Sequence, residues 1–214
     1  MRYQVVLRVF CALGLFLGGV SAAFSLQVCP APDLDRQGAG PWDYTDPQYH
    51  TNPRRLPLVE QHHFMPEVEF LRRSSTRTLG QSISFTLRAS PNHHRALRSM
   101  TQLVQRTDSL WPQGLQYSMD CWFSRARRFQ PNDGMVPMIH GMYYYDIGEY
   151  EEALERMQEG LALEPDNRNI LYNIGLVYME LDRYEEAREH ARKAYDAGFP
   201  LEGLRRQLQA AGEW

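Results

Sequence analysis

The sequence lacks the short motifs that mark most active sites. It contains no G-x-S-x-G sequence, no glycine-rich phosphate loop, and no C-x-x-C or C-x-x-C-H pattern, and the pair Ser74-Ser75 has no nucleophile context. We therefore expect no catalytic residues and no cofactor, and we predict that the protein is not an enzyme.

Charge of neither sign dominates the chain. Lysine and arginine number 23 and the acidic residues 26, which gives a formal net charge of −3. Proteins that bind nucleic acid non-specifically need an excess of positive charge to neutralise phosphates. The balance therefore argues against a nucleic-acid partner.

Long apolar runs are confined to the N-terminus. Arg2 and Arg8 precede an apolar run from Val9 to Val20, and small residues follow it. A run of about 12 residues is too short for a membrane-spanning helix, which needs roughly 20. Residues 1–22 are thus predicted to be a cleaved signal peptide, which leaves an exported chain without a membrane span. A periplasmic location is expected, with secretion or an uncleaved signal anchor as alternatives.

Cysteine is scarce, with three residues in the chain. Cleavage of the signal would remove Cys11 and leave Cys29 and Cys121. Two cysteines in an oxidising compartment indicate one disulfide, Cys29–Cys121, although two unpaired thiols remain an alternative.

The C-terminal half contains a repeat of 34 residues. Gly141-Met142-Tyr143-Tyr144 aligns with Gly175-Leu176-Val177-Tyr178 at this offset, and Tyr150-Glu151-Glu152-Ala153 aligns with Tyr184-Glu185-Glu186-Ala187. Self-similarity at this period is typical of a solenoid of helix–turn–helix units. Small residues let two helix backbones approach, and the tyrosines fill the space around that contact. The expected packing residues are Gly141, Tyr144, Tyr150, Ala153, Gly175, Tyr178, Tyr184 and Ala187.

These residues resemble the tetratricopeptide repeat family, whose turn sequence is also matched by Leu163-Glu164-Pro165-Asp166-Asn167. The segment from Phe85 to Leu97 is similar to one in small exported bacterial repeat proteins, a resemblance that implies no particular function. The expected fold is all-α, a tetratricopeptide-type solenoid with an irregular N-terminal strap.

The resemblance and the spacing of prolines divide the chain into segments. Residues 23–65 are rich in Pro, Asp, Gly and Tyr, show no period, and are expected to form the strap. The helical domain is expected over 66–214: a degenerate hairpin at 66–93, a repeat with a loop insertion at 94–133, repeats at 134–167 and 168–199, and a capping helix at 200–214. If Cys29 pairs with Cys121, the strap is pinned to the second helix of a middle repeat.

The family resemblance implies that the first helix of each hairpin lines a concave groove that binds a protein or peptide partner. Asn173 stands where some family members use Asn to hold a peptide. The expected groove is basic at one end and rich in Met and Tyr in the middle, which suits an adaptable peptide site. The groove residues are Arg95, Arg98, Gln102, Arg106, Met135, Met138, Met142, Tyr145, Asn169, Tyr172, Asn173 and Leu176. The alternative is that these groove residues belong to the core or lie under the strap.

Histidine and methionine residues raise metal binding as an alternative to partner binding. Adjacent residues such as His93 and His94 point about 100° apart on a helix and do not readily chelate one ion, so a helix cap or an inter-repeat hydrogen bond explains them better. Met135, Met138 and Met142 share a helix face near His140, and thioethers select copper(I), so a copper-handling protein is an alternative function. The same spacing serves an apolar helix face, and no metal site is expected. A structural subunit of an envelope complex is a further alternative.

Overall fold

The computed structural model describes residues 29–32, 40–74 and 77–214, so the predicted signal peptide at 1–22 lies outside the described residues. All regular secondary structure in the described part is helical, as predicted. The helices are α1 (Pro47–Thr51), α2 (Leu56–His63), α3 (Pro66–Glu69), α4 (Leu79–Ala89), α5 (His94–Thr107), α6 (Met119–Phe129), α7 (Met135–Asp146), α8 (Tyr150–Leu163), α9 (Arg168–Glu180), α10 (Tyr184–Asp196) and α11 (Gly203–Ala210). None of them is both long and apolar enough to cross a membrane.

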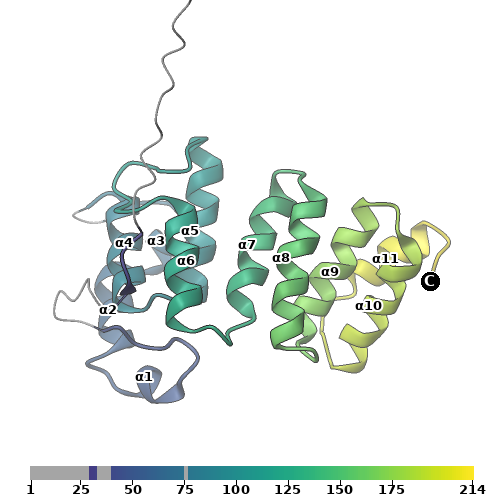
Figure 1. Ribbon diagram of the computed structural model, residues 1–214, viewed down its shortest axis with the longest axis horizontal. Helices are drawn as coiled ribbons and strands as arrows, with labels where there is room; N and C mark the ends of the chain where they lie inside the picture. The colour runs from purple at the N-terminus through teal and green to yellow at the C-terminus, as the bar shows by residue number, and fades with distance from the viewer. Residues whose placement is uncertain (1–28, 33–39, 75–76) are drawn as a thin grey trace, which may run out of the picture.

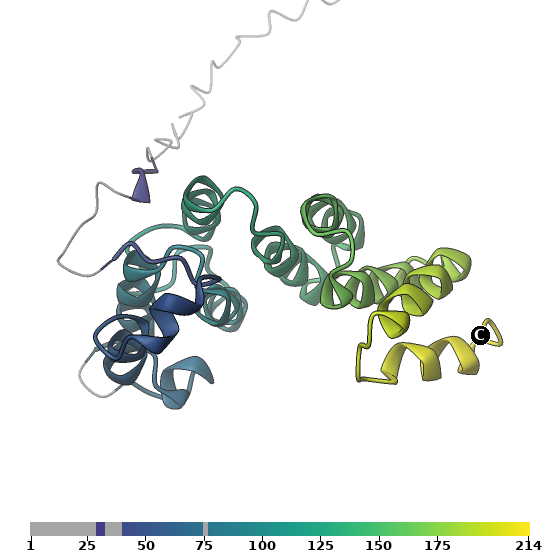
Figure 2. The same ribbon diagram turned by 90° about the horizontal axis from the view of Figure 1, so that it is seen from below.

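The helices follow one another along the long axis of the molecule (Figure 1). Seen from below, the chain forms an arch whose two feet are the N-terminal helices and α11 (Figure 2). Helix α7 contacts both α5 and α9, so the first helices of successive hairpins form one continuous inner row. Helices α6, α8 and α10 lie on the other side of this row. The arrangement is the helical solenoid that the repeat predicted.

The starts of α4, α6 and α9 are encoded locally, by side chains that accept hydrogen bonds from first-turn backbone N–H groups. Thr78 and Gln81 form a reciprocal capping box at the start of α4, and Ser118 caps α6. Asn167 accepts from the backbone N–H groups of Asn169 and Ile170 at the start of α9.

The small residues of the repeat lie where two backbones meet. A Cβ atom on Gly141 would sit 2.8 Å from the carbonyl oxygen of Ala153 and 2.6 Å from Cγ of Met157, so only glycine fits there. A Cβ on Gly175 would sit 3.4 Å from the carbonyl oxygen of Ala187. Both alanines are fully buried. Hairpins α7–α8 and α9–α10 therefore pack closely through glycine and alanine.

The tyrosines of the repeat surround these contacts. Tyr178 is 5% exposed, and Tyr144 is half-buried with its ring beside that of His140. Tyr150 and Tyr184, at the starts of α8 and α10, are also half-buried. The aromatic residues thus cover the edges of each hairpin.

Helices α5 and α6 form a looser pair than the two hairpins that follow. The places of Gly141 and Ala153 are taken there by Thr101 and Met119, both buried. Larger side chains hold two helix axes farther apart. The loop between these helices fills part of the gap, because Leu115 and Tyr117 enter the core.

The N-terminal region contains more helix than its composition predicted, since α1 and α2 lie within the segment expected to be irregular. Pro47 and Pro57 occupy first-turn positions of these helices, where proline is favoured. Helix α4 packs more extensively against α2 than against α3, the partner that the degenerate hairpin at 66–93 implied. Buried Leu56 and Val59 give α2 an apolar face that α3, only one turn long, cannot match.

The predicted disulfide between Cys29 and Cys121 is present, with Cα atoms 5.4 Å apart. It fastens the strap to α6, the second helix of a middle repeat. Arg125, fully buried in α6, donates to the carbonyl oxygen of Pro30 at 2.7 Å, and Arg128 donates to that of Cys29 at 3.0 Å. Residues 29–32 thus lie on the outer row of helices and not on the inner one.

Candidate partner-binding surface

The residues expected in the groove come from the three inner helices, α5, α7 and α9. We call their accessible side the inner surface. Four of the expected residues are exposed: Arg95, Gln102, Arg106 and Asn169. Six are half-buried: Arg98, Met135, Met142, Tyr145, Asn173 and Leu176.

Two of the expected groove residues are instead part of the core, and the expectation is wrong for them. Met138 is 3% exposed, because α7 is packed on several sides by α5, α6, α8 and α9. Tyr172 is 8% exposed because α11 and the loop before it cover the ring. Its ring stacks on Phe199 at 4.0 Å, and its hydroxyl accepts from the backbone N–H of Leu204 at 3.2 Å.

The arginines of the inner surface have partners within the chain. Arg95 makes a two-pronged ion pair with Glu69, and its Nη1 lies 3.4 Å from Glu60. Arg98 pairs with Asp146 of α7 at 2.6 Å, and Arg106 donates to a backbone carbonyl at 2.6 Å. The hydrogen bond from Arg95 lowers the pKa of Glu69, so the pair is ionised at neutral pH. The basic end foreseen for the groove is therefore largely neutralised.

Polar groups on α7 and α9 are also engaged. The Tyr145 hydroxyl donates to Glu180 at 3.0 Å, and burial together with this bond raises the pKa of Tyr145. The Asn173 amide donates to the carbonyl oxygen of Asn169, one turn earlier, at 2.7 Å. Beside its polar residues, the inner surface therefore offers a partner the half-buried apolar side chains of Met142 and Leu176.

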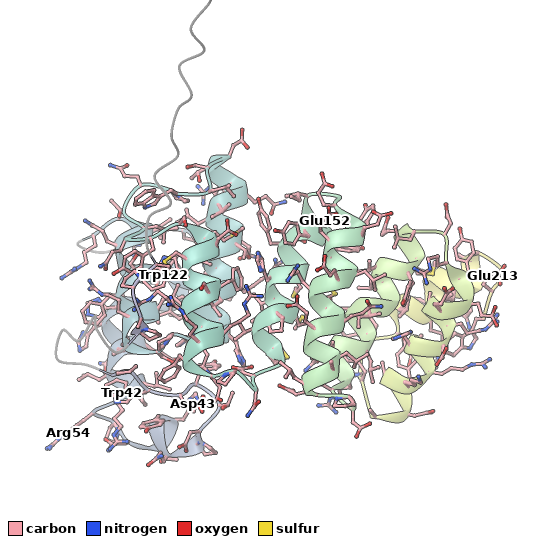
Figure 3. The ribbon with its side chains drawn as sticks, viewed as in Figure 1. Trp42, Asp43, Arg54, Trp122, Glu152 and Glu213 are labelled. Atoms are coloured by element: carbon pink, nitrogen blue, oxygen red, sulfur yellow. A yellow bond between two sulfur atoms is a disulfide. The ribbon has the colours of Figure 1, made fainter. Side chains whose placement is uncertain are left out.

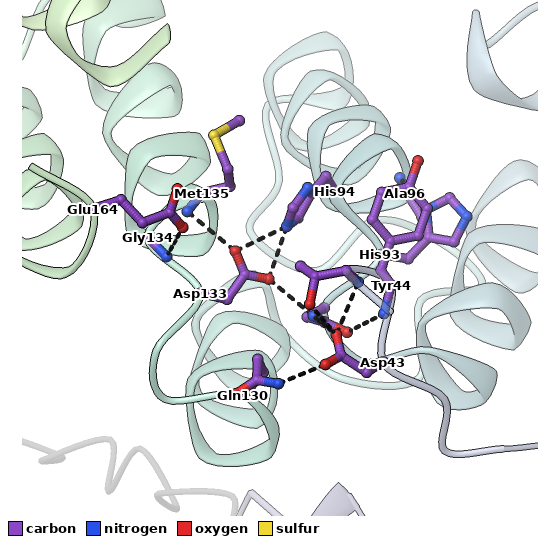
Figure 4. Close-up of polar contacts among 12 residues, drawn as sticks. Asp43, Tyr44, His93, His94, Ala96, Gln130, Asp133, Gly134, Met135 and Glu164 are labelled. Atoms are coloured by element: carbon purple, nitrogen blue, oxygen red, sulfur yellow. Dashed lines mark hydrogen bonds and ion pairs between the residues drawn. The ribbon is translucent and has the colours of Figure 1, made fainter. Parts of the chain in front are cut away.

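A buried polar network joins the strap to two repeat turns (Figure 4). Asn92, fully buried in the turn before α5, donates to Asp43 at 2.8 Å and to Asp133 at 2.9 Å. Asp133 also accepts from His94 at 2.8 Å, and Gln130 donates to Asp43 at 2.6 Å. Burial would raise the pKa of Asp43, but bonds from Asn92, Thr45 and Gln130 outweigh it and lower the pKa.

The histidine pair at this junction has the structural role predicted for it. His93 caps α5, because its Nδ1 accepts from the backbone N–H of Ala96 at 3.1 Å. Its Nε2 must then carry the proton and donate to Glu60, 2.9 Å away. His94 supplies the inter-repeat bond to Asp133. Burial lowers the pKa of His93, which keeps the capping nitrogen unprotonated.

Met138 of the methionine face and the nearby His140 are both packed in the core. Met138 is buried, and the His140 ring stacks flat on Phe123 at 4.1 Å. Within the described ranges, the structure holds no group of three or more His, Cys, Asp or Glu side chains placed to share an ion. The copper alternative therefore gains no support from the geometry.

The helices of the described residues stack as a helical-repeat solenoid. Residues 140–200 match the family model described as tetratricopeptide repeat, so this part of the chain consists of tetratricopeptide repeats, as the 34-residue period predicted. Such repeats generally mediate protein–protein interaction and are typically not enzymes. A comparison with curated proteins finds no match to the chain.

Proposed function

We propose that this protein is an exported, periplasmic scaffold that binds a segment of a partner protein on its inner surface. The observation that carries the proposal is that Met142 and Leu176 are half-buried apolar residues at equivalent repeat positions on the neighbouring inner helices α7 and α9. Two polar inner-surface residues, Arg98 and Tyr145, already have partners within the chain. An apolar centre with a polar rim is the usual composition of a protein interface. Methionine adapts to partners of varied shape.

The proposed location rests on the sequence and on the disulfide. Residues 1–22 have the charge and apolar pattern of a signal peptide. A disulfide between Cys29 and Cys121 persists in an oxidising compartment and is rare in the cytosol. Fusion of residues 1–28 to a reporter that is active only after export tests this part of the proposal separately.

The binding proposal is tested by placing charge on the inner surface. The double variant Met142→Glu and Leu176→Glu is compared with Glu152→Lys, which changes an exposed residue of α8 on the outer row (Figure 3). Proteins that copurify with each form from envelope extract are quantified. We expect the double variant to lose at least one partner that the Glu152 variant retains. Equal recovery of all partners by a folded double variant contradicts binding on the inner surface.

A further inference from the structure

A second concave site lies at the N-terminal end of the arch, away from the inner surface. It has a volume of about 360 Å³ and is lined by α2, α4 and the strap. Val59 and Phe85 form its apolar floor, and Trp42, Leu58 and Arg54 stand at its rim. Figure 3 shows Trp42 and Arg54 together at this end of the molecule, far from Glu213 at the other.

The apolar part of this site is left open by the chain. Leu58 is 44% exposed although it belongs to a helix whose other leucine, Leu56, is fully buried. His63 stacks on Phe85 at 3.7 Å, and Trp42, which also lines the site, stays partly accessible. A bulky apolar group can enter here without displacing a core residue.

The charge around the site is positive. Burial lowers the pKa of His63, and the charged groups that lower it further are all cations: Arg77, His62 and Arg88. Among the described residues, the side chain of Arg54 has no ion-pair or hydrogen-bond partner, unlike the arginines of the inner surface. Among the residues that the structure describes, no carboxylate lines the site to balance these cations.

We infer that this site binds a segment of a partner polypeptide in which a bulky apolar side chain stands next to a carboxylate. The apolar side chain enters between Trp42 and Phe85, and the carboxylate pairs with Arg54. Apolar burial supplies most of the affinity, and the pairing with arginine selects the anion. The site lies open along Leu58, so the peptide chain can continue beyond it on the surface. The inference stands apart from binding on the inner surface, which shares none of these residues.

Short blocked peptides test this with the full chain. The probe is acetyl-Ser-Gly-Phe-Asp-Gly-Ser-amide; one comparison peptide replaces its aspartate by asparagine, and another replaces its phenylalanine by alanine. Binding is followed by NMR shifts of the backbone amides of residues 54–56 and 58–63. We expect the first peptide to bind at least about tenfold more tightly than either comparison peptide, a difference of about 1.4 kcal/mol. Equal binding of the aspartate and asparagine peptides, or no shift at millimolar concentration, overturns the inference.

Two protein variants test whether Arg54 is the cation that pairs with the carboxylate of the peptide. Arg54→Gln removes the cation at the rim, and Arg206→Gln removes an exposed arginine of α11 at the far end as a matched control. We expect Arg54→Gln to abolish the preference for the aspartate peptide and Arg206→Gln to leave it intact. A preference that survives Arg54→Gln overturns the assignment. Binding of 4-phenylbutyrate as tightly as the peptide would mean a small-molecule site and would also contradict the inference.

Discussion

At the scale of single residues, His140 gives the fold a measurable dependence on pH. Burial, with Arg127 and Arg156 nearby, lowers the pKa of His140 to about 4, and neither ring nitrogen has a hydrogen-bond partner among the described residues. The unfolded chain takes up a proton near pH 6.5, whereas the folded chain does not until about pH 4. The contribution of His140 to the free energy of unfolding is therefore fully present above pH 6.5, and it is lost progressively as the pH falls toward 4.

The variant His140→Phe isolates this effect, because phenylalanine keeps the ring stacked on Phe123 and cannot titrate. Between pH 7 and pH 5 we expect wild type to lose about 2 kcal/mol more unfolding free energy than the variant. Urea unfolding of both proteins at the two pH values measures the difference. Equal losses would show that His140 titrates normally in the folded protein.

Ala153 tests the close contact between α7 and α8. It is fully buried, and its carbonyl oxygen lies where a side chain on Gly141 would have to go. We expect Ala153→Leu to destabilise the fold by about 1–3 kcal/mol through overpacking. Ala162→Leu, at an exposed position of the same helix, is the control and should change stability little. Chemical denaturation measures the unfolding free energy of both variants. Equal losses of stability would argue against a tight contact between α7 and α8.

Asn92 tests the polar network that fastens the strap. It donates to two carboxylates, Asp43 and Asp133, which an aspartate at this position cannot do when ionised. We expect Asn92→Asp to cost about 3 kcal/mol at pH 7. Asn132→Asp changes the same position of the next turn, where the side chain is exposed, and should be nearly neutral. Thermal unfolding compares the two, and a neutral Asn92→Asp would mean that the network adds nothing.

At the scale of elements, the disulfide makes the strap part of the domain. It closes a segment of 92 residues, and the chain-entropy argument gives about 4 kcal/mol as an upper figure for its stabilisation. We expect reductant to lower the unfolding midpoint of wild type. The double variant Cys29→Ser and Cys121→Ser should have the same unfolding midpoint as reduced wild type, and reductant should not change the midpoint of the variant. An unchanged wild-type midpoint would show that the strap contributes nothing through this bond.

Periodic elements could be predicted from the sequence, and non-periodic contacts could not. Gly141, Ala153 and their counterparts 34 residues later define α7 to α10, because each hairpin repeats the same backbone contact. The partners of Arg95 and Arg98 could not be predicted, because the positions of Glu69 and Asp146 are not related to those of the two arginines by the 34-residue period. Tyr172 was misplaced because nothing in its own repeat shows that α11 covers it.

At the scale of the whole molecule, the arch separates two surfaces. The inner surface is formed by the repeats that the family model matches and by α5, whereas the N-terminal site depends on α2, which the sequence pattern did not predict. The described strap bonds to α6 and to the turns beside α5 and α7, and its Glu60 also pairs with Arg95 at the α5 end of the inner surface. These contacts lie at the α5 end, so a partner that binds on α7 and α9 does not have to displace them.

Site-specific photo-crosslinking in cells tests directly whether a partner protein binds on the inner surface. A crosslinking amino acid is placed at Met142 or Leu176 on the inner surface, and at Glu152 or Glu189, exposed on the second helices, as controls. We expect discrete adducts to another protein from positions 142 and 176 and none from 152 and 189. Adducts from the control positions alone would contradict it.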